Sequence, residues 1–155
     1  MEKLERHYDA TAEEVWDLWT TSDGIEAWWA PDGFEVKVRT LDLRPGGDLV
    51  YDMTATAPEQ VEFMKNNRMP LTNQSRKTFT QIQPPSRLAY ISVIDFVPGV
   101  EPYDQRTVID LEPRADGVDV VMTVEAMHDA EWTQRLVAGR SNELDNLTKV
   151  IAEKR

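Results

Sequence analysis

The sequence contains no cysteine and only two histidines, His7 and His128, among 155 residues. The absence of cysteine excludes disulfide bonds and thiolate chemistry, and it is typical of proteins in a reducing compartment. Zinc sites need three or four convergent ligands, and no second histidine lies near His128 in the sequence, so we expect no metal. Phosphate-binding glycine loops and nucleophile-elbow motifs are missing as well, and we expect no other cofactor and no recognisable catalytic residues.

Long hydrophobic runs are also absent. No apolar stretch approaches the roughly 18 residues that a transmembrane helix needs, and residues 1–6 lack the apolar segment of a secretory signal. Together with the missing cysteines, these features predict a cytoplasmic protein without membrane insertion. Positive charge is scarce, since 17 Lys and Arg stand against 28 Asp and Glu, for a net charge of −11. Nucleic acid is therefore not an expected partner, because a surface that follows phosphates needs clustered Lys and Arg.

Hydrophobic residues are plentiful enough for a folded core. They make up 41% of the chain and include five tryptophans, which argues against disorder. A chain of 155 residues usually forms one domain, and we predict a single domain over residues 1–155.

The last 27 residues, 129–155, predict one long helix. Asp129 is a suitable N-cap, because its carboxylate can accept hydrogen bonds from free N–H groups of the first turn. Apolar residues at spacings of three, four or eight share one face, and they are Trp132, Leu136, Leu144, Leu147 and Ile151. Arg140 interrupts this face.

The rest of the chain predicts a sheet with a few helices. A weak first strand over residues 3–9 precedes a helix opened by a Thr11–Glu14 capping box, and a second short helix capped by Ser22 or Asp23 follows. Alternating residues predict strands from Phe34 onward, interrupted by an inserted helix or lid over residues 57–72 that starts near Pro58. Later strands are expected over 77–83, 88–97, from about 107, and 118–124. This order predicts an α+β fold, with an antiparallel sheet and helices on one face.

Several short motifs carry a resemblance to a known family. They are Asp9-Ala10-Thr11 with Val15-Trp16, then Trp28-Trp29-Ala30-Pro31, Leu43-Arg44-Pro45-Gly46-Gly47, Pro84-Pro85-Ser86-Arg87-Leu88, and the C-terminal helix. Because these motifs occur in this order, the chain resembles the Activator of Hsp90 ATPase homologue 1-like (AHSA1) family of the START-like, Bet v 1-like (SRPBCC) superfamily. The resemblance implies a helix-grip fold, in which a curved antiparallel sheet wraps around the long C-terminal helix and leaves an apolar cavity between them. It implies little about function, because one scaffold carries binding proteins, cyclases and cochaperones.

The chain departs from the family pattern at two places. The family usually has Gly-Trp in the middle of the last helix, whereas this chain has Gly139-Arg140, and the segment 57–72 is longer than the common hairpin. Both changes fall where a cavity and its entrance are expected, so ligand preferences of relatives do not transfer.

Aromatic, methionine and neighbouring side chains are the candidates to line such a cavity. Each of them is individually more typical of a packed core, whereas the family fold favours a pocket for the group as a whole. The candidates are Trp28, Trp29, Phe34, Tyr51, Met53, Phe63, Met64, Met69, Phe79, Tyr90, Phe96, Met122, Met127, His128, Trp132, Leu136 and Arg140.

Arg140 is the most specific of these candidates. A guanidinium that faces the cavity can bind a ligand carboxylate or phosphate through two hydrogen bonds. The alternatives are an internal ion pair with Asp95, Asp110 or Glu125, or a surface position.

The sequence therefore predicts a protein that binds a small hydrophobic or amphipathic ligand, acidic if Arg140 faces it. One alternative is a cyclase or lyase acting on a polyketide-like or aromatic substrate, with Tyr51, Tyr90, His128 and Arg140 as its polar groups. Another is a chaperone-linked protein-interaction module. The sequence does not decide whether the protein forms a homodimer through an edge strand.

Overall fold

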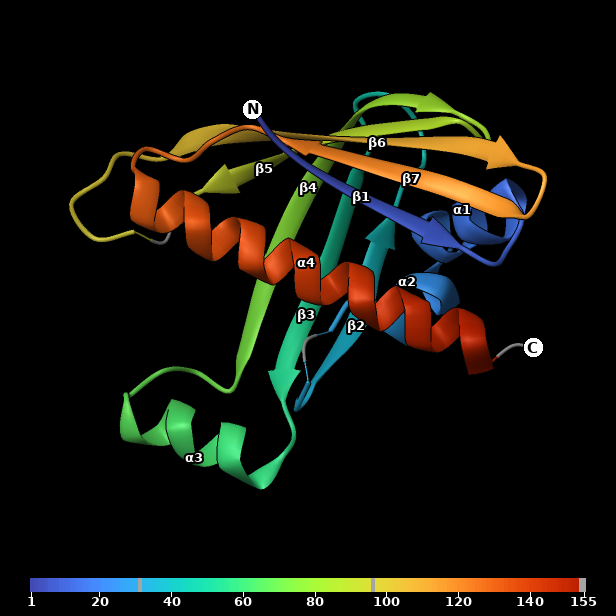
Figure 1. Ribbon diagram of the computed structural model, residues 1–155. Coiled ribbons are helices and arrows are strands. Elements are labelled where there is room, and N and C mark those ends of the chain that lie inside the picture. The colour runs from blue at the N-terminus through green and yellow to red at the C-terminus, as the bar shows by residue number, and fades with distance from the viewer. Residues whose placement is uncertain (31, 96, 154–155) are drawn as a thin grey trace.

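The computed structural model describes residues 1–30, 32–95 and 97–153. In this part of the chain seven strands form one antiparallel sheet in the order β1-β7-β6-β5-β4-β3-β2. The strands are β1 (Glu2–Tyr8), β2 (Phe34–Leu41), β3 (Asp48–Ala55), β4 (Thr72–Gln83), β5 (Arg87–Ile94), β6 (Tyr103–Arg114) and β7 (Gly117–Val124). The sheet curves, and the long helix α4 (Ala130–Glu153) lies across its inner face (Figure 1). This is the helix-grip α+β fold that the sequence predicted.

Two short helices follow β1, as expected. Helix α1 (Ala12–Thr20) begins at the predicted capping box, where the Glu14 backbone N–H donates to Thr11 Oγ1 at 3.1 Å. Helix α2 (Ser22–Trp28) begins at Ser22, and its cap lies one residue before the earlier of the two predicted caps. Thr21 caps it, because Thr21 is the last extended residue and its Oγ1 accepts from the Gly24 N–H at 3.0 Å. The prediction of Ser22 or Asp23 as the cap was wrong.

The inserted segment between β3 and β4 forms helix α3 (Pro58–Asn66), which begins at Pro58 as predicted. Figure 1 shows α3 at the far tip of the β3–β4 hairpin, away from α4. The strand after it is longer than the sequence pattern indicated, since β4 begins at Thr72 rather than Lys77.

Helix α4 is anchored mainly by its second half. Its start is capped as predicted, with the Trp132 N–H donating to Asp129 Oδ1 at 2.8 Å. Leu144, Leu147 and Ile151 are buried, whereas Trp132 and Leu136 are only half-buried. The hydroxyl of Tyr8, on β1, donates to the Leu144 carbonyl at 2.8 Å, at the point where the buried half begins.

A chain of aromatic rings in edge-to-face and tilted contact fills the core between the short helices and the middle of the sheet. The rings of Trp19 and Trp28 meet edge to face with centroids 4.7 Å apart, and Trp28 contacts Trp29 at 5.1 Å. Trp29 in turn lies 6.0 Å from the ring of Tyr51 and 6.3 Å from that of Tyr90. These rings belong to the same core cluster as Leu144, Leu147 and Ile151, so the second half of α4 is part of a tightly packed core.

Truncating the two halves of α4 is expected to have unequal effects. Leu147→Ala removes a fully buried side chain and should lower the free energy of unfolding by about 3 kcal/mol, because it leaves a cavity in a packed core. Leu136→Ala trims a half-buried side chain and should cost about 1 kcal/mol. Urea denaturation of both variants measures the difference. Equal losses would contradict the view that only the second half of α4 is tightly packed.

Candidate functional site

A pocket of about 820 Å³ opens between the first half of α4 and the central strands β4, β5 and β6. The helix contributes Trp132, Arg135, Leu136 and Arg140, and Met127 precedes it. The strands contribute Asn73, Gln74, Ser75, Arg76, Lys77, Ser92, Val93, Ile94 and Gln105, and Asp95 directly follows β5. The pocket is only partly enclosed, and its size suits a small molecule.

A row of polar side chains crosses the floor of this pocket. Lys77 on β4 pairs in register with Ser92 on β5, and Ser92 pairs with Gln105 on β6. Paired residues of neighbouring strands point to the same face, so the three side chains lie side by side beneath α4. Lys77 Nζ donates to Ser92 Oγ at 2.8 Å. Gln105 is 1% exposed, and its Oε1 has no hydrogen-bond partner among the described residues.

Lys77 is the most unusual residue of the site. It is 5% exposed, and among the residues that the structure describes no carboxylate forms an ion pair with it. Its ammonium nitrogen lies 5.4 Å from the centre of the Tyr90 ring and 6.0 Å from that of Tyr51. Burial, reinforced by the nearby charge of Arg140, lowers the pKa of Lys77 from 10.5 to about 7. At neutral pH much of this lysine is therefore an uncharged amine.

Arg140 faces the same pocket from the other side. Its guanidinium donates to both carboxylate oxygens of Glu143, at 2.9 and 3.1 Å, and the two side chains are only 13% and 14% exposed. Burial lowers the pKa of Arg140, but Glu143 together with the nearby Tyr90 and Tyr51 outweighs burial and holds the pKa above its ordinary value. Arg140 therefore stays charged, and its Nε has no hydrogen-bond partner within the described chain.

Arg140 does not use any of the three carboxylates considered from the sequence. Asp95 lines the same pocket without an ion pair to Arg140, Asp110 binds Arg87 at 2.8 Å, and Glu125 accepts from a backbone N–H of β6 at 2.7 Å. The partner is Glu143, one turn further along α4, because residues three apart share a helix face.

The charge of the pocket is opposite to that of the whole protein. Its described lining contains four cationic side chains, Arg76, Lys77, Arg135 and Arg140, and one carboxylate, Asp95. The protein as a whole carries −11. Arg76, Arg135 and Arg140 are paired with Asp48, Glu131 and Glu143. Lys77 is the cation of the lining for which no ion pair occurs within the described chain.

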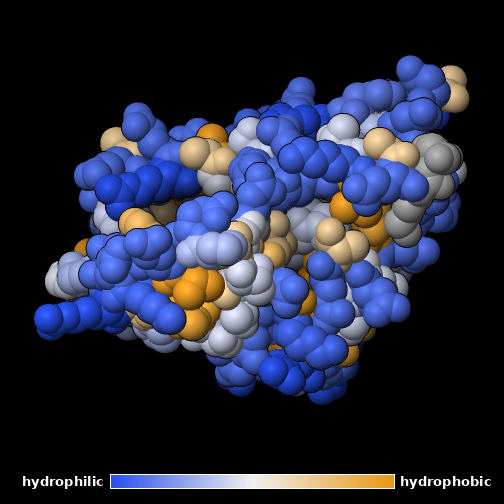
Figure 2. Space-filling view, turned by 90° about the horizontal axis from the view of Figure 1, so that it is seen from below, coloured by the Kyte–Doolittle hydropathy of each residue, from blue (hydrophilic) through white to orange (hydrophobic). Residues whose placement is uncertain are grey.

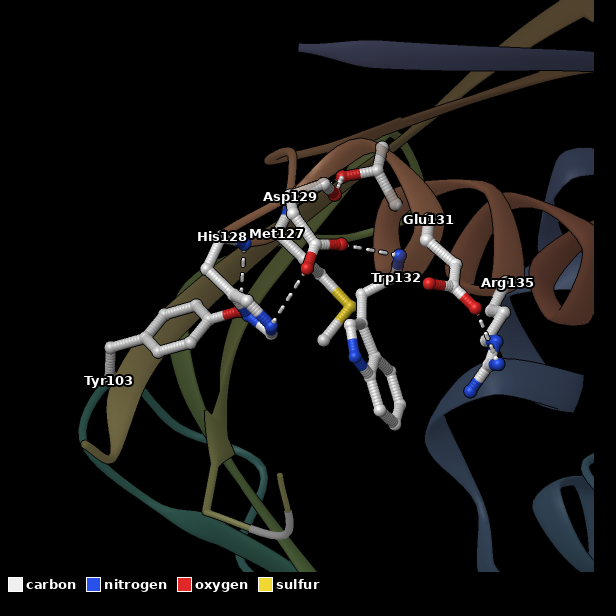
Figure 3. A network of polar contacts seen from close by, with 8 residues as sticks. Tyr103, Met127, His128, Asp129, Glu131, Trp132 and Arg135 are labelled. Atoms are coloured by element: carbon white, nitrogen blue, oxygen red, sulfur yellow. Dashed lines mark hydrogen bonds and ion pairs between the residues drawn. The ribbon is translucent and has the colours of Figure 1, made fainter. Parts of the chain in front are cut away.

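The rim at the start of α4 is held by a polar network (Figure 3). Tyr103 Oη lies 2.8 Å from His128 Nδ1, and His128 Nε2 lies 3.6 Å from the Asp129 carboxylate. The Arg135 guanidinium stacks 4.8 Å from the Trp132 ring. In Figure 3 the side chains of Met127 and Trp132 point to the same side of this network. The network fixes the edge of the pocket, and His128 itself is not among the residues lining it.

The cavity candidates from the sequence fall into distinct places. Trp132, Leu136, Arg140 and Met127 line the pocket. The core holds Trp28, Trp29, Tyr51, Phe79, Tyr90 and Met122, while Met53 packs partly against it and Phe34 is half-buried. Near α3, Met64 is buried, whereas Phe63 and Met69 are exposed. Phe96 lies outside the described residues.

Segment 57–72 lies next to the strand residues of the pocket in sequence. None of the residues lining the pocket belongs to this segment, but the lining residues of β4, Asn73–Lys77, follow it almost directly. Figure 1 shows α3 at the end of the hairpin where β4 begins. The lid stays a prediction.

The sequence prediction missed Lys77 and Glu143, the two residues that define the charge of the site. A signal for Lys77 was available, since Lys77 and Phe79 are two apart in a strand and therefore face the same way. Once β4 is extended back to Thr72, the alternation places Lys77 on the core face. Glu143 could also have been identified, because it follows Arg140 by three residues and therefore lies on the same helix face.

Other kinds of site find no basis in the described chain. Among its residues no three His, Asp or Glu side chains come together in a way that could hold a metal ion. No helix in the same part of the chain is both long and apolar enough to cross a membrane.

The family model for "Activator of Hsp90 ATPase homolog 1-like protein" matches residues 9–152. The chain belongs to this family. Among curated proteins no significant sequence match is found.

Solved structures of family members share the fold over nearly the whole chain. A protein from Chromobacterium violaceum is 25% identical with a TM-score of 0.78, covering 97% of this chain and 95% of its own. An AHSA1-like protein from Aeromonas hydrophila is 21% identical with a TM-score of 0.76, covering 99% and 92%. An AHSA1 protein from Silicibacter pomeroyi is 17% identical with a TM-score of 0.77, covering 99% of each chain. The last two support the fold alone.

The lowered pKa of Lys77 predicts a specific dependence of stability on pH. The unfolded chain binds the Lys77 proton up to about pH 10.5 and the folded chain only up to about pH 7, so the cost of burying this lysine shrinks and stability rises as pH increases through that window. Lys77→Met removes the titration. Relative to wild type it should raise the free energy of unfolding more at pH 7 than at pH 10.

Chemical denaturation at the two pH values measures this difference, and Lys37→Met, which alters an exposed lysine, is the matched control. A gain for Lys77→Met that is the same at both pH values would show that Lys77 titrates normally.

Proposed function

We propose that this protein binds a small amphipathic acid, with its carboxylate between Lys77 and Arg140 and its apolar part beneath the first half of α4. The observation that carries the proposal is the buried cluster of two cations, Lys77 and Arg140, with one carboxylate, Glu143. A buried charge without a counter-ion is costly, and the lysine loses its proton in part to relieve that cost. A ligand carboxylate supplies the missing charge.

The charge balance favours a singly charged ligand group. With both cations protonated the cluster carries one surplus positive charge, which one carboxylate neutralises. A doubly charged phosphate leaves a surplus negative charge in a protein that already carries −11. Arg140 Nε and the Lys77 ammonium are donors on the pocket floor, and charge-assisted hydrogen bonds to a carboxylate are stronger than neutral ones.

The remaining walls suit an apolar body. Met127, Trp132 and Leu136 lie on the helix side, and Val93 and Ile94 on the sheet side. Methionine and tryptophan accept ligands of varied shape through dispersion and stacking. This part of the pocket gives affinity, and the cationic floor gives orientation.

An interaction module of the kind the family name suggests has weaker support. It would need a broad exposed apolar patch. Seen from below, the molecule presents mainly hydrophilic residues with small separate hydrophobic areas (Figure 2). The large exposed apolar residues of the described chain, Met1, Leu43, Phe63, Met69 and Val93, come from separate segments, apart from the neighbours Phe63 and Met69.

The test compares acids with their neutral amides. Octanoate and phenylacetate should bind at least about tenfold more tightly than octanamide and phenylacetamide, since hydrogen bonds to charged groups contribute about 1.5–3 kcal/mol. In Lys77→Met the cluster is neutral, and this preference should largely disappear. Isothermal titration calorimetry measures each affinity.

Lys37→Met is again the matched control, and it should keep the preference of wild type. Native mass spectrometry of freshly purified protein adds an independent reading, because a retained acid would appear as extra mass. Equal binding of acid and amide by wild type would contradict the proposal.

Binding of the acid should also take up protons. At pH 8 the Lys77 amine is mostly neutral, and an adjacent carboxylate raises its pKa, so complex formation should absorb close to one proton. Calorimetry of octanoate binding in buffers of different ionisation enthalpy gives this number directly. Uptake in Lys77→Met should be near zero, and uptake equal to that of wild type would assign the proton to another group.

A further inference from the structure

Lys77 combines features of a reactive amine rather than only those of a binding residue. Its Nζ lines a pocket open to small molecules, and no carboxylate of the described chain pairs with it. The groups around it are Tyr51 on β3, Tyr90 and Ser92 on β5, and Arg140 and Glu143 on α4. Desolvation together with a neighbouring cation is a known way to activate a lysine for attack on carbonyl carbon.

We infer that Lys77 forms an imine with small oxo acids, which are acids that carry an aldehyde or ketone group close to their carboxylate. This inference rests on the proposed carboxylate site, because the acid group held at Arg140 brings the carbonyl carbon to the Lys77 nitrogen. The pocket thereby becomes a site for covalent, reversible capture of its ligand.

The step balances without an outside oxidant or reductant. The lone pair of the uncharged Nζ forms a bond to the carbonyl carbon, and the carbonyl oxygen takes up a proton to give a carbinolamine. That hydroxyl group leaves as water after a second proton transfer, and a protonated imine remains on Nζ. The overall change is uncharged amine plus carbonyl plus one proton from solvent giving protonated imine plus water.

The surroundings favour both the attack and its product. In the ligand-free protein the lowered pKa of Lys77, about 7, leaves much of the amine uncharged near neutral pH. A bound carboxylate reduces this uncharged fraction, and the attack proceeds from the fraction that remains. Once the protonated imine has formed, its fixed positive charge lies beside the ligand carboxylate, which stabilises it. Ser92 Oγ, 2.8 Å from Nζ, is placed to exchange a hydrogen bond with the departing oxygen. Gln105 Oε1, on the same floor, is an open acceptor for a hydroxyl of the carbinolamine.

Reductive trapping tests the inference. Wild-type protein is incubated with pyruvate, acetoacetate or levulinate, which differ in the spacing of carbonyl and carboxylate, and with cyanoborohydride. At least one probe should give a single adduct, with the mass of the acid minus water plus two hydrogens, and peptide mapping should place it on Lys77. Lys77→Met should lose this adduct. The double variant Arg140→Gln/Glu143→Gln, which keeps the amine and the net charge of the cluster, should be trapped at least about tenfold more slowly, in line with the loss of a charged hydrogen bond.

The outcomes separate the two proposals. Octanoate binding with no trapping by any probe overturns the imine inference and leaves the carboxylate site standing. Adducts spread over exposed lysines such as Lys3 and Lys37, at the rate seen for Lys77, also overturn it. Absence of both octanoate binding and trapping overturns the proposed function together with the inference.

Discussion

The packing of the second half of α4 against the aromatic core is the constraint on which the pocket depends. Leu144, Leu147 and Ile151 are buried there, and the Tyr8 hydroxyl binds the Leu144 carbonyl. A helix of 24 residues is stiff, so fixing one half also fixes the path of the other. The distance between the first half of α4 and the curved sheet is therefore determined by how the second half packs. Trp132 and Leu136 reach only part of the way down, and space is left beneath them.

Arg140 lies where the sealed half of α4 gives way to the open half. Leu144, the next residue on the same face, is fully buried, and Leu136, the preceding one, lines the pocket. A large apolar side chain at this position would extend the seal and fill part of the space. Arg140 instead forms an ion pair with Glu143, and this pairing keeps the guanidinium charged although it is buried. The floor opposite contributes Lys77, so the site gains a second cation without a second carboxylate.

Much of the fold could be predicted from the sequence, because it is encoded locally. The Thr11–Glu14 box, Pro58 at a helix start, Asp129 as a cap and the alternation from Phe34 each identify an element through its own residues. The site could be predicted only in its helical half, since Arg140 interrupts an obvious apolar face. Its other half depends on the register of β4 against β5, which pairs Lys77 with Ser92. That pairing is set by the whole sheet.

The opposite signs of the pocket and the whole protein have a consequence for the ligand. Beyond about 8–10 Å the field of a protein carrying −11 is screened at physiological salt, so an approaching anion meets repulsion mainly close to the surface. Steering by long-range attraction is therefore absent, and affinity has to come from contacts made inside the pocket. Those contacts are of two kinds, a cationic floor and apolar walls, and a small inorganic anion can use only the first. A ligand that uses both is an acid with an apolar body. Its carboxylate restores the charge balance that Lys77 otherwise achieves by losing a proton, so the protein exchanges a partly neutral amine for a paired ammonium when it binds.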